Sequence, residues 1–253
     1  MCQLNRPYSE SRQQLFIDIG NSYIKAIWDI DGQHERLQEV TTLASLLTCI
    51  PHVPDVIWLS DVSVASRQKA HAALLKAAWQ VPVHQASLAV HGKYLTTDYA
   101  SDQLGIDRWL AMLACRQQIS PPFVLVDYGT AVTLDVVDAG GTHQGGYILP
   151  GLSLMRAALQ QQTGITDMTP MRQHPHLAQD TGSAIEQGAQ LAVASLIHQM
   201  MQTLPDTTAL CLSGGHGRTL LPYLQISAIC LDDLVLQGLI RVAQLEAAHL
   251  ATD

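Results

Sequence analysis

The sequence predicts an α/β fold built from two similar halves. A pattern of two strands joined by a tight glycine turn occurs at residues 15–32 (LFIDIGNSYIKAIWDIDG) and again at residues 124–141 (VLVDYGTAVTLDVVDAGG). Pro121 and Pro122 stand just before the second copy and cannot continue the helical pattern that precedes them. Because each copy opens a run of strand and helix patterns, we expect two half-domains that face each other across a cleft.

The first half is predicted to contain a mixed five-stranded sheet with flanking helices. After the hairpin we expect a strand near residues 36–40, a helix at 43–50, a strand at 55–62, a helix at 64–79 and a strand at 81–85. A polar loop at residues 91–102 then leads to an amphipathic helix at residues 103–119. On that helix Leu110, Leu113 and Ala114 share one face with Ile106.

The second half repeats the hairpin and continues with a different set of helices. We expect a strand at residues 145–151, a helix at 152–161, a loop at 163–180, a long helix at 183–204, a strand with a glycine turn at 209–217 and a final helix at 231–248. Asp180 or Thr181 is expected to cap the long helix. That helix is rich in apolar residues, which favours a dimer, although burial within its own domain would also explain them.

These patterns divide the chain into three parts. Residues 1–14 form a polar N-terminal extension without a signal-peptide pattern, residues 15–120 the first domain and residues 121–253 the second. A net charge of −8 argues against nucleic acid as a partner, and no apolar run approaches the roughly 20 residues that span a membrane. The five cysteines are scattered without CxxC spacing, so a zinc site or disulfide framework is not indicated, and a cytoplasmic setting is expected.

Each hairpin places a carboxylate just before its glycine turn. Asp18 precedes a turn with Gly20, Asn21 and Ser22, and Asp127 precedes a turn with Gly129 and Thr130. Glycine lets backbone N–H groups approach a phosphate closely, and the carboxylate can hold a cation that neutralises the phosphate charge. Lys25 can add a positive charge. Plain turns would also explain one such hairpin, but two matched carboxylates favour phosphate binding.

Together these residues resemble those of type III pantothenate kinase. The resemblance rests on segments in the family's order, namely residues 18–22, 105–108, 127–131, 145–151, 181–188, 213–215 and 233–239. It implies two ribonuclease H-like domains of the acetate kinase/sugar kinase/Hsp70/actin superfamily. The implied activity is phosphorylation of pantothenate by ATP, the first step of coenzyme A biosynthesis, by a homodimer that uses magnesium and potassium or ammonium.

The resemblance also implies a role for individual positions. Asp107 would be the catalytic base, and the pantothenate contacts would be Tyr99, Gly105, Ile106, Asp107, Arg108 and Thr181, the last of these from the same or the partner subunit. Tyr94 is the alternative to Tyr99. ATP would be bound by Asp18, Ile19, Gly20, Asn21, Ser22, Tyr23, Ile24, Lys25 and Thr130. Asp127 would hold the monovalent cation, and Asp18 would hold magnesium.

Asp107 is also a catalytic candidate from its position alone. It stands in the first turn of a predicted helix, and phosphoryl transfer to an alcohol uses a carboxylate that accepts the hydroxyl proton. Complementarity with the helix dipole, worth about 0.3–1 kcal/mol, would explain the residue without catalysis. Arg108 is placed to bind the substrate carboxylate or a phosphate. The alternatives to a pantothenate kinase are a non-catalytic transcriptional accessory factor of the same family and a sugar kinase of the same superfamily.

Overall fold

The structure is a computed structural model that describes residues 12–50, 52–91, 94–100, 102–165, 169 and 177–250. By its internal contacts the chain divides into unit 1, Met1–Ala86 with Val242–Asp253, and unit 2, Ser87–Arg241. The predicted boundary between residues 120 and 121 separates the two sheets instead, and as a domain boundary it stays a prediction. Most of the predicted N-terminal extension and of the predicted loop at 163–180 lies outside the described residues.

Unit 1 contains a five-stranded mixed sheet in the order β3-β2-β1-β4-β5. Its elements along the chain are β1 (Gln13–Ile19), β2 (Ile24–Ile30), β3 (Gln33–Arg36), α1 (Leu43–Cys49), β4 (Val56–Asp61), α2 (Ala65–Trp79) and β5 (Val83–Gln85). The first three strands are antiparallel, and β4 and β5 continue the sheet in parallel from β1. The predicted element order is confirmed. Only β3 lies earlier than expected, because Val40 forms an isolated bridge with Ile24 instead.

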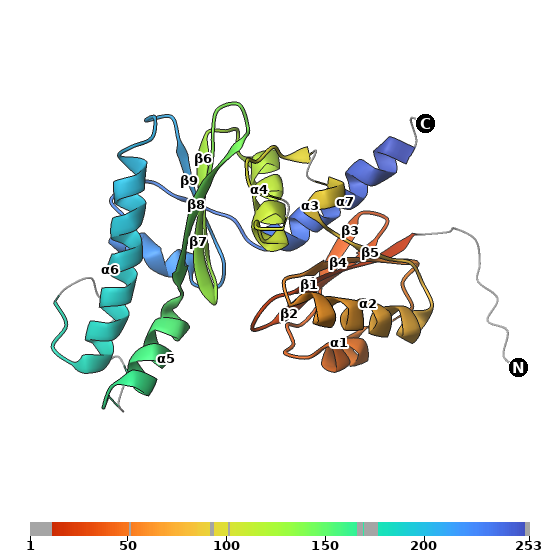
Figure 1. The fold of residues 1–253 in the computed structure, drawn as a ribbon, viewed down its shortest axis with the longest axis horizontal. Coiled ribbons are helices and arrows are strands. Elements are labelled where there is room, and N and C mark those ends of the chain that lie inside the picture. Colours follow the sequence, from red (N-terminus) through yellow and green to blue (C-terminus); the bar gives the residue numbers. More distant parts are fainter. Residues whose placement is uncertain are drawn as a thin grey trace, which may run out of the picture. The chain divides into compact units, whose positions relative to one another are not determined.

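Alternation along the strands of unit 1 gives its sheet one apolar face that α1 and α2 cover (Figure 1). Leu15, Ile17 and Ile19 of β1 lie in this core, which Leu46 of α1 and Leu75 of α2 complete. Burial of each such side chain contributes roughly 1.5–3 kcal/mol. The packed strand β1 therefore holds the residues at its carboxyl end, including Asp18, in a defined place.

Unit 2 repeats this architecture around a second five-stranded sheet. Its elements are α3 (Leu88–His91), α4 (Ile106–Gln118), β6 (Phe123–Tyr128), β7 (Ala131–Val137), β8 (His143–Pro150), α5 (Leu152–Gln162), α6 (Thr181–Met201), β9 (Ala209–Ser213), the 3₁₀ helix η2 (Gly217–Tyr223), β10 (Ile229–Cys230) and α7 (Leu234–Leu250), which extends past the unit boundary. The sheet order β10-β9-β6-β7-β8 is the first sheet's order read from the other edge. The duplication predicted from the repeated hairpin is confirmed.

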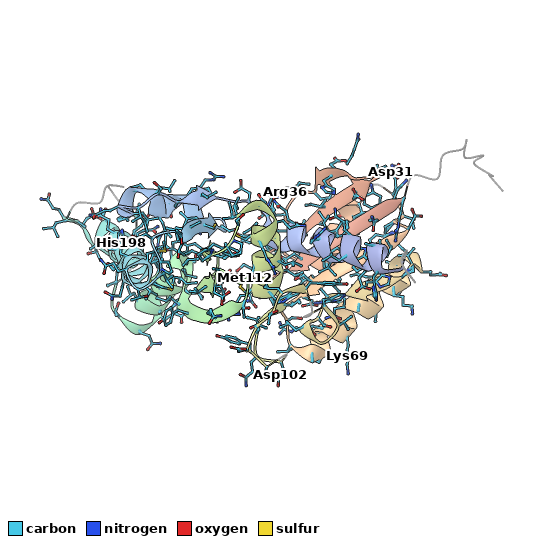
Figure 2. The ribbon with its side chains drawn as sticks, turned by 90° about the horizontal axis from the view of Figure 1, so that it is seen from above. Asp31, Arg36, Lys69, Asp102, Met112 and His198 are labelled. Carbon is cyan, nitrogen blue, oxygen red and sulfur yellow. The ribbon has the colours of Figure 1, made fainter. Side chains whose placement is uncertain are left out.

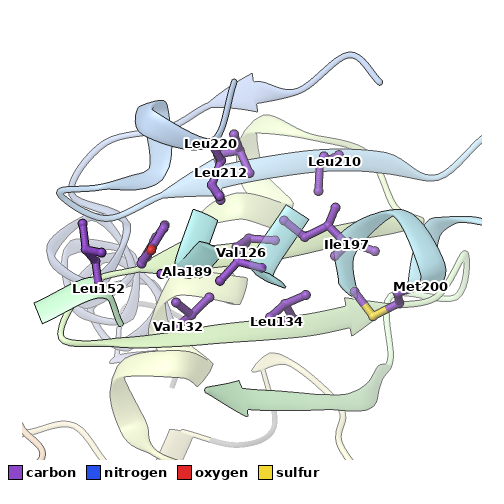
Figure 3. Close-up of a cluster of buried hydrophobic side chains, with 13 residues drawn as sticks. Val126, Val132, Leu134, Leu152, Ala189, Ile197, Met200, Leu210, Leu212 and Leu220 are labelled. Carbon is purple, nitrogen blue, oxygen red and sulfur yellow. The ribbon is translucent and has the colours of Figure 1, made fainter. Parts of the chain in front are cut away.

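The second sheet separates α4 from α6 (Figure 1). Val132 and Leu134 of β7 face α6 and pack with its Ala189 and Ile197 (Figure 3). Because side chains alternate along a strand, Asp135 of β7 faces the other side, where α4 lies. Burial within unit 2 thus accounts for much of the apolar surface of α6. This agrees with the alternative explanation that the sequence left open, burial of the helix within its own domain.

Helix α4 is buried on all sides, whereas the sequence predicted a helix with a single buried face. All residues from 108 to 115 are buried, so the helix is covered on every side over two turns, whereas Ile106 is only partly buried. Figure 2 marks Met112 on this helix, and its side chain is fully buried. Within the described part of the chain, every helix is too short or too polar to cross a bilayer.

The two hairpins differ by one residue in their turns. In the first, Ile19 pairs with Ile24, and in the second, Tyr128 pairs with Val132, so the second turn is one residue shorter. Asp18 and Asp127 are therefore equivalent, as the sequence indicates. Beyond the turn the two segments are therefore offset by one residue, so that Asp29 lies within β2 whereas Asp138 follows β7.

Gly238 allows α7 to lie directly against the backbone of α4. A Cβ atom at this position would stand 2.1 Å from the carbonyl oxygen of Leu110. We therefore expect Gly238→Ala to lower the free energy of unfolding by about 1–3 kcal/mol through overpacking. Urea-induced unfolding of the full chain measures this loss.

Gly188→Ala on α6 is the matched control. A Cβ at residue 188 meets no atom within 4 Å, and alanine is favoured over glycine in a helix by about 1 kcal/mol. This variant should be neutral or stabilising. Equal losses in both variants would contradict the close approach of the two helices.

Candidate active site

The first hairpin presents a buried carboxylate beneath an exposed turn. Asp18 is the penultimate residue of β1 and has 9% of its surface exposed, and the Ser60 hydroxyl donates to its Oδ1 at 3.0 Å. Lys25 is its neighbour across the strand pair. The turn closes through a hydrogen bond of 3.1 Å from the Gly20 N–H to the Tyr23 carbonyl. The side chains of Asn21, Ser22 and Tyr23 are exposed beyond it.

The side chains of two residues predicted to bind ATP lie in the hydrophobic core. The side chains of Ile19 and Ile24 are buried in the cluster that α1 and α2 cover. Only their backbone groups are therefore available to a ligand. This leaves Asp18, Gly20, Asn21, Ser22, Tyr23 and Lys25 as the side chains and turn residues that the first hairpin can offer.

The second hairpin is held by two close backbone approaches. Gly151 N–H donates to the Thr130 carbonyl at 2.9 Å, and a Cβ on Gly151 would stand 2.3 Å from the Gly129 carbonyl oxygen. Gly214, at φ +83°, follows β9, and a Cβ there would stand 2.6 Å from Asp127 Oδ1. The chain thus packs tightly around the turn, with the Asp127 carboxylate at its base.

The surroundings of Asp127 fit a hard, weakly held cation. Among the described residues, no group of three or more His, Cys, Asp or Glu side chains could hold a metal ion. A cation at Asp127 would therefore be bound by one carboxylate together with backbone carbonyl or water oxygens, a donor set that suits potassium or magnesium rather than a transition metal. The same holds for Asp18, whose hydroxyl neighbour Ser60 occupies the register position that Ser213 takes beside Asp127.

Asp107 lies folded back over the N-terminus of α4. Its Oδ1 accepts a hydrogen bond of 2.8 Å from the Arg108 N–H. Gly105, the N-cap residue, makes room for it, since a Cβ there would stand 2.5 Å from the same oxygen. Burial raises the pKa of Asp107 above the ordinary 3.8, and this outweighs the lowering by the N–H and the charge of Arg108. A carboxylate with a raised pKa is a stronger proton acceptor than an exposed one.

Arg108 does not present a free charge. Arg108 is only 8% exposed. Its guanidinium donates through Nε to Asp135 Oδ2 at 3.1 Å and through Nη2 to Oδ1 at 2.5 Å. Burial acts to lower the pKa of Arg108, but the hydrogen bonds and charge of Asp135 outweigh it and raise the pKa. The expected contact with a substrate anion must therefore use the remaining N–H groups.

Tyr99 joins this cluster, and Tyr94 does not. The Tyr99 ring stacks on His143 with centroids 5.2 Å apart, and Arg108 Cζ lies 5.6 Å from its centroid. Tyr94 stacks on His91 instead, at 6.5 Å. Tyr99 is thus the neighbour of Arg108, and its assignment to the pantothenate pocket stays a prediction.

Three members of the cluster were missed from the sequence: Thr97, Asp135 and His143. His143 Nε2 lies 2.8 Å from Asp135 Oδ1, and its Nδ1 lies 3.0 Å from Thr97 Oγ1. The one available signal was Asp135 itself, an acidic residue within the apolar strand sequence AVTLDVV. Its partners are distant in sequence, so no local pattern connects them.

Thr181 stands apart from the other predicted pantothenate contacts. It is exposed in the first turn of α6, and Asp180 caps that helix by accepting from the Ser183 N–H at 2.8 Å. Helices α6 and α4 cover opposite faces of the second sheet (Figure 1). Within one chain the structure therefore does not bring Thr181 to Asp107.

Comparison with known proteins identifies the family to which this arrangement belongs. The type III pantothenate kinase family model matches residues 14–203. The chain belongs to the type III pantothenate kinase family. The type III pantothenate kinase of Alcanivorax borkumensis is 31% identical over 245 residues, which cover 90% of this chain and 98% of that protein.

Solved structures are similar in fold. A Campylobacter jejuni protein assigned to the Baf family of transcriptional activators is 22% identical, with a TM-score of 0.63, and the match covers 92% of this chain and 99% of that one. MreB5 of Spiroplasma citri, bound to ADP, is 10% identical with a TM-score of 0.55 over 97% and 100% of the two chains. At these identities the likeness shows the fold alone. The fold of this type III pantothenate kinase family member, two mixed five-stranded sheets with flanking helices, is the predicted one.

Proposed function

We propose that this chain phosphorylates pantothenate with ATP to give 4′-phosphopantothenate, the first step of coenzyme A biosynthesis. Family membership makes it a kinase. The observation that carries the residue assignment is Asp107, a half-buried carboxylate at the start of α4 that accepts from the N–H of Arg108, the residue whose guanidinium lies by the Tyr99 ring. The described cysteines, Cys49, Cys115, Cys211 and Cys230, are free thiols, which supports a cytoplasmic setting.

Asp107 acts as the general base of a direct phosphoryl transfer. It orients the pantothenate hydroxyl and accepts its proton as the new O–P bond forms. Burial raises its pKa, so the carboxylate is a better proton acceptor than an exposed aspartate. Gly105 keeps the carboxylate at the helix N-terminus, since any side chain there would displace it.

Each hairpin binds phosphate through its turn. In unit 1 the groups are the turn N–H donors with Asn21, Ser22 and Lys25, and in unit 2 they are those of Thr130. Magnesium would be held by Asp18, and potassium or ammonium by Asp127. When bound, these cations neutralise phosphate charge.

Arg108 and Tyr99 form the pantothenate side of the site with Gly105 and Ile106. Arginine carries five N–H donors in a planar fork, of which one on Nε and one on Nη2 bind Asp135. The remaining N–H groups are directional donors for the pantothenate carboxylate. The Tyr99 ring adds an apolar surface over the guanidinium.

We place Thr181 in the site of the partner subunit of a homodimer. In one chain it lies on the far side of the second sheet from Asp107, which supports a contribution in trans. Further along α6, Leu191 is 48% exposed. This apolar residue provides a surface for contact with a second copy.

Wild-type protein should produce ADP from ATP only when pantothenate is supplied, and Asp107→Asn should lower kcat by about 10²–10⁴-fold because no group then accepts the proton. A coupled ADP assay measures both. Asp102→Asn, at an exposed position near α4, is the matched control and should retain activity.

In the pH profile of wild-type kcat, the midpoint of the loss of activity on acidification should lie above pH 3.8. The base works only when it is ionised, and burial raises the pKa of Asp107 above that value.

Normal kcat in the Asp107→Asn variant would remove this residue from the mechanism. Efficient phosphorylation of glucose by the wild type would instead favour a sugar kinase. Failure with every acceptor, while ATP still binds, would favour a non-catalytic role.

Asp127→Ala should abolish activation by potassium, because the carboxylate that holds the cation is lost. Initial rates with potassium or sodium chloride at constant ionic strength should then differ by less than about twofold. Asp206→Ala, exposed in the same unit, is the control and should keep the potassium response. A retained potassium response in Asp127→Ala would place the cation elsewhere.

Mixing inactive variants tests the contribution of Thr181 in trans. Asp107→Asn and Thr181→Ala chains should each be impaired, and re-equilibrated mixtures should regain about a quarter of wild-type activity, since half the dimers are mixed and each of these has one intact site. Activity that never exceeds the sum of the two variants, or a monomer in light scattering, would contradict the proposal.

A further inference from the structure

We propose that Asp135 and His143 are positioning residues that hold Arg108 and Tyr99 in place for the acceptor substrate. This inference rests on the proposed function, because it assigns the substrate contacts to Arg108 and Tyr99. Neither Asp135 nor His143 touches the reacting groups in our assignment. They act through the two residues that do.

The hydrogen bonds of this cluster run in one direction. Asp135, ionised opposite Arg108, can only accept, so the Nε2 of His143 carries the proton and donates to it at 2.8 Å. The Nδ1 of His143 is then an acceptor for the hydroxyl of Thr97 at 3.0 Å. Thr97 Oγ1 in turn accepts from the Tyr99 N–H at 3.2 Å. The backbone of Tyr99 is thereby tied to the same carboxylate as the guanidinium of Arg108.

Burial makes this connection stiff. Asp135 and His143 are 1% and 0% exposed. In such surroundings an unpaired charge is costly, so the pairing of the guanidinium with Asp135 is strongly favoured. A bidentate contact also sets the plane of the guanidinium, which a single hydrogen bond would leave free to rotate.

The glycine pair of β8 makes room for the cluster. Gly146 pairs with Asp135 across the strands, and a Cβ there would stand 3.0 Å from Asp135 Oδ1 and 1.8 Å from the Leu134 carbonyl oxygen. At Gly145, φ is +119° and a Cβ would lie 4.0 Å from the Tyr99 ring. A side chain at residue 146 would push β8, with His143 at its start, away from β7, and one at residue 145 would strain the backbone.

The ion pair also sets the electrostatics of the pocket. Asp135 offsets the charge of Arg108. Recognition of the substrate anion therefore depends on where the remaining guanidinium N–H groups point more than on net charge. Loss of the guanidinium's orientation should weaken binding of the acceptor substrate and leave binding of ATP almost unaffected.

The first sheet provides a matched control. Asp29 of β2 is buried, and its Oδ1 lies 3.2 Å from Nε2 of His34 on β3. Like Asp135 and His143, the two residues lie on the second and third strands of their sheet. Gln14 Nε2 also donates to Asp29 Oδ2 at 3.3 Å, and none of these three residues is assigned to the pantothenate pocket.

The experiment compares Asp135→Asn and His143→Gln with Asp29→Asn and His34→Gln in steady-state kinetics and thermal unfolding. We expect Asp135→Asn to raise KM for pantothenate at least about tenfold and to lower kcat, with KM for ATP within about twofold of wild type. His143→Gln should act in the same direction by about three- to tenfold. The two control variants should keep both KM values even where their unfolding temperatures fall equally.

Equal changes in KM for ATP and pantothenate, or the same kinetic effect in the control pair, would overturn the positioning role. His143→Gln, which keeps the ion pair, decides the question if Asp135→Asn does not fold. Unchanged pantothenate kinetics in His143→Gln would then refute the proposal.

A second readout separates this inference from the proposed function. If the wild type does not phosphorylate pantothenate, the proposed function fails, whereas the positioning role is still decided by NMR of the arginine Nε–H signals. Arg108, assigned through Arg108→Lys, should show a protected Nε–H whose exchange is at least about tenfold faster in His143→Gln and unchanged in His34→Gln. Equal exchange in wild type and His143→Gln would overturn the inference.

Discussion

The ion pair between Arg108 and Asp135 is the constraint on which the candidate site depends. It joins the first turn of α4 to the middle of β7, two segments that are far apart in the chain. Once this pair is formed, the position of Asp107 follows, because it precedes Arg108 in the same helical turn and accepts from the Arg108 N–H. Breaking the pair would leave a buried charge without a partner, which typically costs several kcal/mol. The position of the base is therefore coupled to the stability of unit 2.

The duplicated architecture supports two different tasks. In both sheets an aspartate ends the central strand and a serine of the parallel neighbour lies beside it, Ser60 with Asp18 and Ser213 with Asp127. Both sheets also carry an aspartate–histidine pair on their second and third strands. In the second sheet this pair has acquired Arg108 and Tyr99 as partners, whereas in the first it contacts Gln14. The same strand order can thus support a phosphate hairpin in each unit and an acceptor pocket in only one.

The sequence was sufficient to predict the fold and to single out the motif residues as candidates, because both depend on local patterns. The roles of those residues stay predictions. Alternation and turn glycines placed the repeated hairpin, and the order of strands and helices in the first half was correct. The two-residue strand β10 is too short to show any periodicity. The burial of α4 on every side could not be predicted either, since it depends on which elements surround the helix. For the same reason Asp135, His143 and Thr97 escaped notice, because their roles exist only after β7, β8 and the loop before α4 have come together.

Close approach explains why glycines accompany the carboxylates of unit 2. A Cβ would stand 2.5 Å from Asp107 Oδ1 at Gly105, 2.6 Å from Asp127 Oδ1 at Gly214 and 3.0 Å from Asp135 Oδ1 at Gly146. Backbone flexibility or access for a phosphate would not by itself require glycine at these positions. Each of the three glycines lies against the side chain of an acidic residue. A larger residue would force the carboxylate to turn away from its helix terminus, from its place at the base of the hairpin turn or from its arginine. The glycines of motifs such as GIDR and GGYILPG therefore provide the space that the acidic side chains need. The turn geometry is a consequence of that packing.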